Sequence, residues 1–119
     1  MEGNIPIEKG AKTELMNLLL DFYGELLPEG QREAMEYFYG DDLSLGEIAQ
    51  IVGITRQGVR DRIVKGEHAL RTTEQRLGLV ARFSEQQRTL TQIRAELEAL
   101  RPRCGDRIDG IIGMVEELL

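Results

Sequence analysis

A short stretch near the middle of the chain concentrates side chains that can recognise nucleic acid. Residues 54–65, ITRQGVRDRIVK, carry four basic residues and one acid. Arginine can form a bidentate pair with guanine, and glutamine can do the same with adenine. Threonine and lysine suit contacts with phosphate oxygens. The candidate binding residues of this stretch are Thr55, Arg56, Gln57, Arg60, Asp61 and Lys65.

Residues that could support catalysis or metal binding are isolated in the sequence. His68 is the only histidine and Cys104 the only cysteine, so a zinc site has no ligand set. Asp41 and Asp42 adjoin each other without the spacing of a calcium-binding loop. Neither serine stands in a G-x-S-x-G turn. We therefore expect a protein that is not an enzyme and that uses no metal or cofactor.

The sequence around the basic stretch predicts two helices joined by a glycine turn. Ser44 and Glu47 form an S-x-x-E capping box, which predicts a helix over roughly 44–52 that stops at Gly53. Thr55 fits the N-cap of the next helix. Apolar residues at helical spacing predict the seam between the two helices: Ile48, Ala49, Val52, Ile54, Val59 and Ile63.

This pattern is that of a helix-turn-helix, whose second helix presents its early residues to the DNA major groove. Arg62 points to another side of that helix, toward the DNA backbone or solvent. Two alternatives remain open. An ordinary helical hairpin with a solvated basic face has the same pattern, and a helix-turn-helix can be retained for contacts with proteins.

Helical spacing continues on both sides of this motif, and no segment alternates like a β-strand. In the first half, one helix ends near Gly24 and a second opens at Pro28 and ends at Gly40. In the second half, only Gly78 interrupts the pattern, which predicts a helix over 74–100 about 40 Å long. Pro102 and Gly105 then break the chain before a last amphipathic helix over 106–119.

The predicted long helix carries an apolar stripe with a heptad rhythm, interrupted by the polar Gln86. One small core cannot cover a helix of this length. The stripe can pack on the last helix of the same chain or on a second copy, and we favour a homodimer, with half-sites about 34 Å apart. The stripe comprises Leu79, Phe83, Leu90, Ile93, Leu97 and Leu100.

Length and composition agree with a single helical domain. The chain has 119 residues, of which 41% are hydrophobic, 30% charged and 5% aromatic. These values exclude wholesale disorder and favour helices over a β-sandwich. The net charge is −6, so a nucleic-acid site must be a local basic patch on an acidic body. The single cysteine and the lack of any signal-like or membrane-spanning apolar run predict a cytoplasmic protein.

Residues 26–70 begin LLPEGQREAMEYFYGDDLSLGEIAQ and continue IVGITRQGVRDRIVKGEHAL. This segment resembles region 4 of bacterial sigma factors and, more closely, the YlxM-like family of small bacterial proteins that share that region's fold. The phrases LLDFYGELL, MEYFYGDDLSLGEIA and TRQGVRDRI are similar to the family's pattern. The resemblance runs from about Leu19 to Leu70. The chain departs from the pattern at Gly30 and Gly58, in its first dozen residues and in its overall acidity.

The resemblance implies an all-α, DNA-binding-type fold and a regulatory role. Genes of this family lie beside those for the GTPases of the signal recognition particle, which implies a part in protein targeting. The expected partners are nucleic acid, with DNA favoured over RNA, and components of that particle. We thus expect one all-helical domain over 1–119. It would hold a sigma-region-4-like helix-turn-helix core over about 12–70 and a long helical extension over about 71–119, which could serve for dimerisation.

Overall fold

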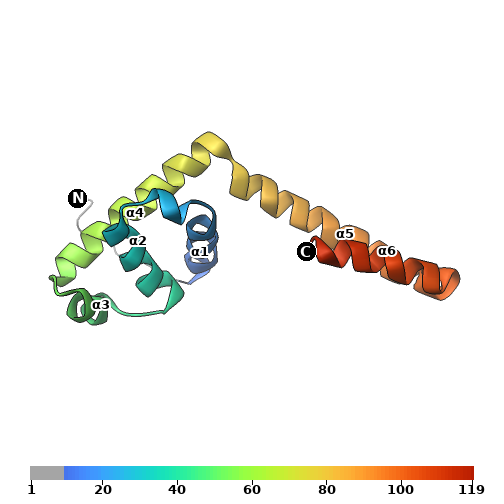
Figure 1. The fold of residues 1–119 in the computed structure, drawn as a ribbon, viewed down its shortest axis with the longest axis horizontal. Helices are drawn as coiled ribbons and strands as arrows, with labels where there is room; N and C mark the ends of the chain where they lie inside the picture. The colour runs from blue at the N-terminus through green and yellow to red at the C-terminus, as the bar shows by residue number, and fades with distance from the viewer. Residues whose placement is uncertain (1–9) are drawn as a thin grey trace. The chain divides into compact units, whose positions relative to one another are not determined.

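The computed structural model describes residues 10–119, and every regular element in this range is helical (Figure 1). The expected all-α fold is therefore confirmed. The chain forms two compact units, of which the first ends at Val80 and the second comprises Ala81–Leu119. The elements are α1 (Ala11–Tyr23), η2 (Gly24–Leu26), α2 (Glu29–Met35), η3 (Glu36–Gly40), α3 (Leu45–Val52), α4 (Arg56–Leu77), α5 (Leu79–Cys104) and α6 (Asp106–Glu117).

The first unit has a core to which α1, α2, α3 and α4 all contribute. Burying an aliphatic side chain completely stabilises the folded state by roughly 1.5–3 kcal/mol. Several such residues, far apart in sequence, therefore fix the helices around one another. The largest fully buried side chains are Met16, Leu19, Met35, Ile48, Val59, Ile63 and Leu70.

The helix predicted to end at Gly40 does so, but its last turn is wider than an α-helix. Residues 36–40 form the π-helical turn η3, which carries the buried Phe38 and Tyr39. Their rings meet edge to face, with centroids 4.9 Å apart and planes at 82°. Since aromatic pairs prefer this geometry, the turn delivers both rings into the core beside α1 and α4.

The helices α2 and α4 cross closely at Gly66. A Cβ atom at this position would lie 2.5 Å from the Sδ atom of Met35, and Met35 is fully buried. Only glycine fits without a shift of the neighbouring side chain. Ala49, the small residue of the predicted seam between the other pair of helices, is buried in α3.

The prediction of one helix over 74–100 is wrong. The chain breaks at Gly78, whose φ of 65° is left-handed, so α4 ends at Leu77 and α5 starts at Leu79. Glycine adopts this conformation without the strain of a side chain. The break predicted at Pro102 is also absent, because α5 continues through it to Cys104. The other predicted break, at Gly105, is confirmed: its φ is 61°, and α6 starts directly after it.

A buried tyrosine holds the break at Gly78 in place. The Tyr23 hydroxyl donates to Oε1 of Glu74 at 2.6 Å, and the backbone N–H of Val80 donates to the same oxygen at 3.0 Å. The N–H of Leu79 donates to the Tyr23 hydroxyl oxygen at 3.2 Å. Burial, aided by the bond to Glu74, raises the pKa of Tyr23. These bonds satisfy N–H groups that the start of α5 would otherwise leave unpaired.

A second tyrosine–glutamate pair lies one heptad earlier on α4. The Tyr39 hydroxyl donates to Glu67, whose other oxygen pairs with Nζ of Lys12 at 2.9 Å. Burial and the bond to Glu67 raise the pKa of Tyr39 well above its usual range. The Tyr39 side chain therefore remains neutral, and α1, η3 and α4 are joined by one polar network.

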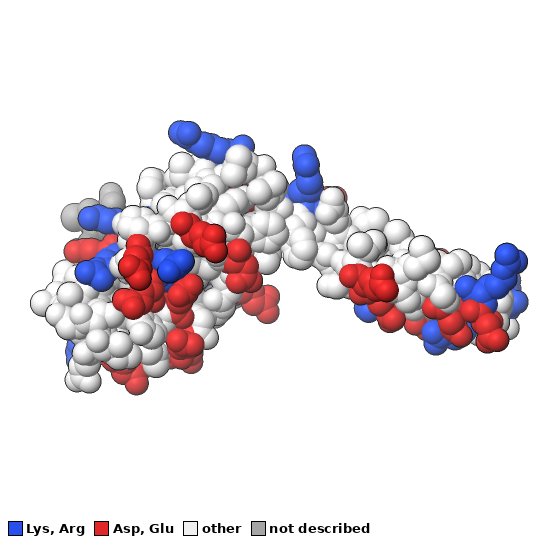
Figure 2. Space-filling view, viewed as in Figure 1, with Lys and Arg blue, Asp and Glu red and all other residues white. Residues whose placement is uncertain are grey.

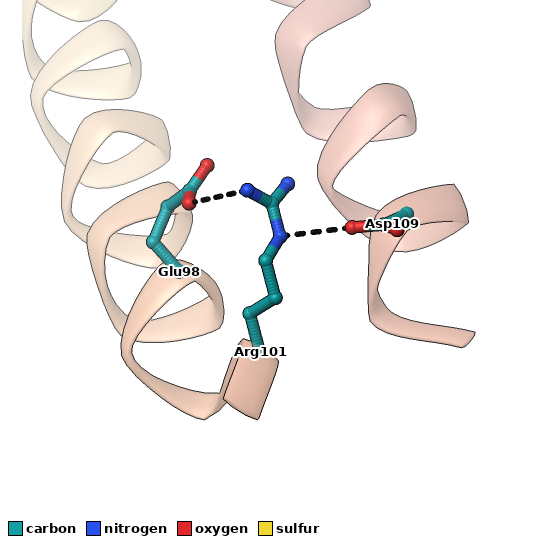
Figure 3. A network of polar contacts seen from close by, with 3 residues as sticks. All are labelled: Glu98, Arg101 and Asp109. Atoms are coloured by element: carbon teal, nitrogen blue, oxygen red, sulfur yellow. Dashed lines mark hydrogen bonds and ion pairs between the residues drawn. The ribbon is translucent and has the colours of Figure 1, made fainter. Parts of the chain in front are cut away.

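The second unit is a helical hairpin of α5 and α6 (Figure 1). Buried Ile108, Ile112 and Val115 line one side of α6. The side-chain amide of Gln87 donates to the carbonyl of Leu118 at 3.0 Å. At the other end, Arg101 donates to Asp109 at 2.9 Å (Figure 3). The two helices therefore run antiparallel and contact each other along α6.

The helices of the described chain give no membrane-crossing candidate. Within residues 10–119, no helix combines the length and the hydropathy that a membrane span requires.

Candidate nucleic-acid interface

The turn between α3 and α4 is built by the caps that the sequence predicts. The N–H of Glu47 donates to Oγ of Ser44 at 3.1 Å, and the N–H of Ser44 donates to Oε1 of Glu47 at 2.8 Å. Gly53 ends α3 with a φ of 76°. Thr55 caps α4, since its Oγ1 accepts from the N–H of Gly58 at 2.9 Å. The capping box, the glycine turn and the second cap are all confirmed.

The predicted seam between the two helices is also confirmed. Ile48 and Ala49 of α3 and Val59 and Ile63 of α4 are buried. Val52 and Ile54 are half-buried and pack against this core. Because the seam holds one side of α4 inward, the opposite side of its first turns is turned toward solvent.

Five of the six candidate binding residues lie on the first three turns of α4, outside the buried seam, and we call this set the recognition face. At 100° per residue, these positions run around half of the helix circumference and along about 14 Å of its length, from Arg56 to Lys65. Three of its residues are cationic and one is acidic. The sixth candidate, Thr55, is the exposed N-cap at its start. The recognition face consists of Arg56, Gln57, Arg60, Asp61 and Lys65, all exposed except the half-buried Arg60.

One side-chain pair within the recognition face already has a fixed orientation. The Gln57 amide donates to Oδ1 of Asp61 at 2.9 Å. Asp61 thereby orients the Gln57 amide along the helix. Its carboxylate keeps its negative charge, which disfavours a phosphate at this point of the recognition face.

Two arginines of α4 lie across glycines of other helices. A Cβ atom at Gly46 of α3 would stand 3.0 Å from Nε of Arg56. A Cβ atom at Gly30 of α2 would stand 3.0 Å from Nη1 of Arg62. Arg62 thus lies toward α2, outside the recognition face. This contact also gives a packing reason for Gly30, which the helical pattern alone does not explain.

Acidic residues are concentrated in the first half of the chain, before α4. Residues 1–53 contain 11 acidic and 3 basic residues, whereas residues 54–107 contain 12 basic and 7 acidic residues. On the side of the molecule drawn in Figure 2, acidic side chains gather over part of the first unit. A cationic stripe beside acidic surface limits where a polyanion can approach.

The other residues that could support catalysis or metal binding lie on separate elements of the described chain. His68 lies exposed on α4, and Cys104 is exposed at the end of α5. Asp41 and Asp42 form the turn before α3, where Asp42 has a φ of 56°. Among residues 10–119, no group of three His, Cys, Asp or Glu side chains could hold a metal ion.

Comparison with known proteins gives consistent relatives. A family model described as "Putative helix-turn-helix protein, YlxM / p13 like" (UPF0122) matches residues 10–103. A UPF0122 protein of Thermoanaerobacter sp. (strain X514) is 43% identical over 103 residues, which cover 87% of this chain and 86% of that protein. One of Desulforamulus reducens is 46% identical over 78 residues, covering 66% and 67%. One of Listeria monocytogenes is 41% identical over 86 residues, covering 72% and 78%. The chain belongs to the UPF0122 family of YlxM/p13-like helix-turn-helix proteins.

Proposed function

We propose that this protein binds nucleic acid through the recognition face of α4, with duplex DNA favoured over RNA. The observation that carries the proposal is the placement of three cations and one amide, outside the buried seam, on the first three turns of the second helix of a helix-turn-helix. In such motifs the early residues of this helix enter the major groove. That groove is accessible in B-form DNA, whereas the major groove of A-form RNA is too narrow for side chains to read.

The residues divide by the chemistry that each can offer. Gln57 and Arg60 have side chains that can hydrogen-bond to base edges. Lys65, a flexible point charge one turn further along, suits a phosphate. Thr55 lies at the start of the helix, where its hydroxyl can also reach the DNA backbone while it caps Gly58.

The resemblance to YlxM-like proteins supports a regulatory role in the signal recognition particle pathway. Its basis is the family's gene neighbourhood. The partners proposed on this basis are components of the particle, either its RNA or its proteins. A pull-down from bacterial lysate with and without nuclease separates the two cases, because only a nucleic-acid-mediated complex disappears on nuclease treatment.

Fluorescence anisotropy with a mixed-sequence 24-base-pair DNA duplex tests the proposed face. The double variant R56A/R60A should reduce the magnitude of the slope of log affinity against log salt by about 0.9 for each phosphate that the protein no longer neutralises. The matched control R103A/R107A removes the same charge from exposed positions outside the recognition face. Equal effects of the two double variants would show only general charge attraction and would contradict the proposed face.

A second candidate function is self-association through the hairpin of α5 and α6. The residues of the heptad stripe on α5 differ in exposure. Leu90 and Leu97 are half-buried, whereas the other apolar residues of the stripe are exposed. An open groove of about 530 Å³ is lined by Phe83, Leu90 and Leu118 among others. We propose a second copy of this chain as the occupant. The exposed apolar residues of the hairpin are Phe83, Ile93, Leu100, Ile111, Met114 and Leu118.

Light scattering after size-exclusion chromatography tests the homodimer. The variant I93D places a charge on the exposed part of the stripe without removing a buried side chain, so it should convert a dimer to a folded monomer. Leu90 and Leu97 are unsuitable for this test because their substitution also damages the hairpin. A wild-type monomer at protein concentrations of about 100 µM, where a dimer with a micromolar Kd is assembled, would exclude a stable dimer and favour an adaptor that binds another protein.

A further inference from the structure

Arg56 is an arginine of the recognition face that lies against a second helix of the motif. Its guanidinium lies over Gly46, in the first turn of α3, with Nε and Nη2 at 3.0 and 3.2 Å from where a Cβ atom would stand. The side chain therefore bridges the first turn of α3 and the first turn of α4. At the other glycines of residues 10–119, the nearest neighbours of an added Cβ atom lie outside the recognition face.

Glycine at position 46 is unexpected from helix formation alone. It stands second in α3, where its φ is not in the left-handed region. Glycine is among the least favourable residues within a helix, and alanine is the most favourable. The three atoms nearest to an added Cβ atom all belong to the head of the Arg56 side chain. The space that Gly46 leaves is thus filled by the guanidinium.

This location separates Arg56 from the base-reading part of the face. In helix-turn-helix complexes the first helix crosses the DNA backbone while the second lies in the groove. A guanidinium held between the two first turns is therefore at the level of the backbone. We propose that Arg56 is a phosphate-contacting residue and that Gly46 is its positioning residue, leaving base reading to Gln57 and Arg60. This inference rests on the proposed function.

Gly30 and Arg62 provide a matched control within the same unit. Gly30 is also the second residue of its helix, and an added Cβ atom would also meet an α4 guanidinium at 3.0 Å. Arg62, however, lies toward α2, outside the recognition face. G30A and G46A therefore make the same chemical change and displace the same kind of group at two different places.

The experiment combines binding and stability. Anisotropy with AT-rich and GC-rich 24-base-pair duplexes, at 50 to 200 mM salt, compares wild type with R56A, G46A, G46A/R56A and G30A. R56A should reduce the magnitude of the slope of log affinity against log salt by about 0.9. When the salt is raised from 50 to 200 mM, the loss of affinity in R56A should therefore be about 3.5-fold smaller than the loss in wild type. The reduction in affinity should be the same for both duplexes, because phosphates carry no sequence information.

G46A should change the slope in the same direction as R56A but by a smaller amount, because the added Cβ atom displaces the guanidinium by only a few tenths of an ångström. Its melting temperature should equal or exceed that of wild type, because alanine favours a helix more than glycine does. In the R56A background, G46A should have no further effect on binding, and G30A should leave the slope unchanged. An unchanged slope for G46A would overturn the inference while an effect of R56A still supports the proposed function. A larger effect of R56A on GC-rich DNA would instead indicate guanine reading and overturn the phosphate role. No effect of R56A would contradict the proposed contribution of this residue altogether.

Discussion

The two units of the chain differ in how completely they cover their apolar side chains. In the first unit, four α-helices place Met16, Ile48 and Ile63 in one core with essentially no exposure. In the second, the buried apolar residues are Ile108, Ile112 and Val115, all on α6, and Met114 and Leu118 are 67% and 63% exposed. The first unit also exposes apolar side chains, such as Leu26 at 71%, but these surround an extensive buried core. A closed core can hold a recognition helix in a fixed orientation. A two-helix hairpin has too few elements to enclose its own apolar surface, which leaves part of that surface exposed to solvent.

The largest effect that separates the two units is expected from a core truncation. I63A should lower the free energy of unfolding by about 2–5 kcal/mol, because it opens a cavity in a closely packed core. I111A, at a residue of α6 that is 47% exposed, should change it far less. Urea unfolding of both variants measures the difference. Comparable changes would show that the hairpin is as tightly packed as the core.

A smaller effect is expected where α2 crosses α4. G66A should lower the free energy of unfolding by about 1–3 kcal/mol, because the new methyl group collides with Met35. The control is G113A in α6, where nothing lies within 4 Å of an added Cβ atom. Because G113A replaces a glycine within a helix by alanine, it should raise the free energy of unfolding by up to about 1 kcal/mol. The melting temperatures of G66A and G113A should therefore shift in opposite directions from that of wild type. Shifts of the same sign would contradict the close crossing of α2 and α4.

The smallest effect concerns pH and is specific to the first unit. The folded pKa of Tyr39 is raised above the unfolded value near 10. Above that pH the unfolded chain releases a proton that the folded chain retains, so stability present below about pH 10 falls as the pH rises. Y39F should reduce this alkaline fall in melting temperature, while Tyr23 preserves part of it. A profile over the alkaline range around pH 10 that is identical in wild type and Y39F would contradict a role for the Tyr39–Glu67 pair.

Much of the candidate site could be predicted because its signals are local. Ser44 pairs with Glu47, and Thr55 pairs with Gly58, each across three residues. The 3.6-residue period placed the seam on one side of α4 and left the residues of the recognition face outside it. The direction of Arg56 and of Arg62 could not be predicted, because each depends on a glycine in a different helix.

The sequence by itself determined the helical class, the caps, the glycine turn and the apolar positions of the seam on α4. These features depend on hydrogen bonds and periodicities within a few residues. Only the tertiary structure decided the break at Gly78, which Tyr23 secures from more than fifty residues away. It also decided which part of the α5 stripe is covered by α6 and why Gly66 must lack a side chain. In each case the deciding atom belongs to another helix, so its position follows from packing and not from local preference.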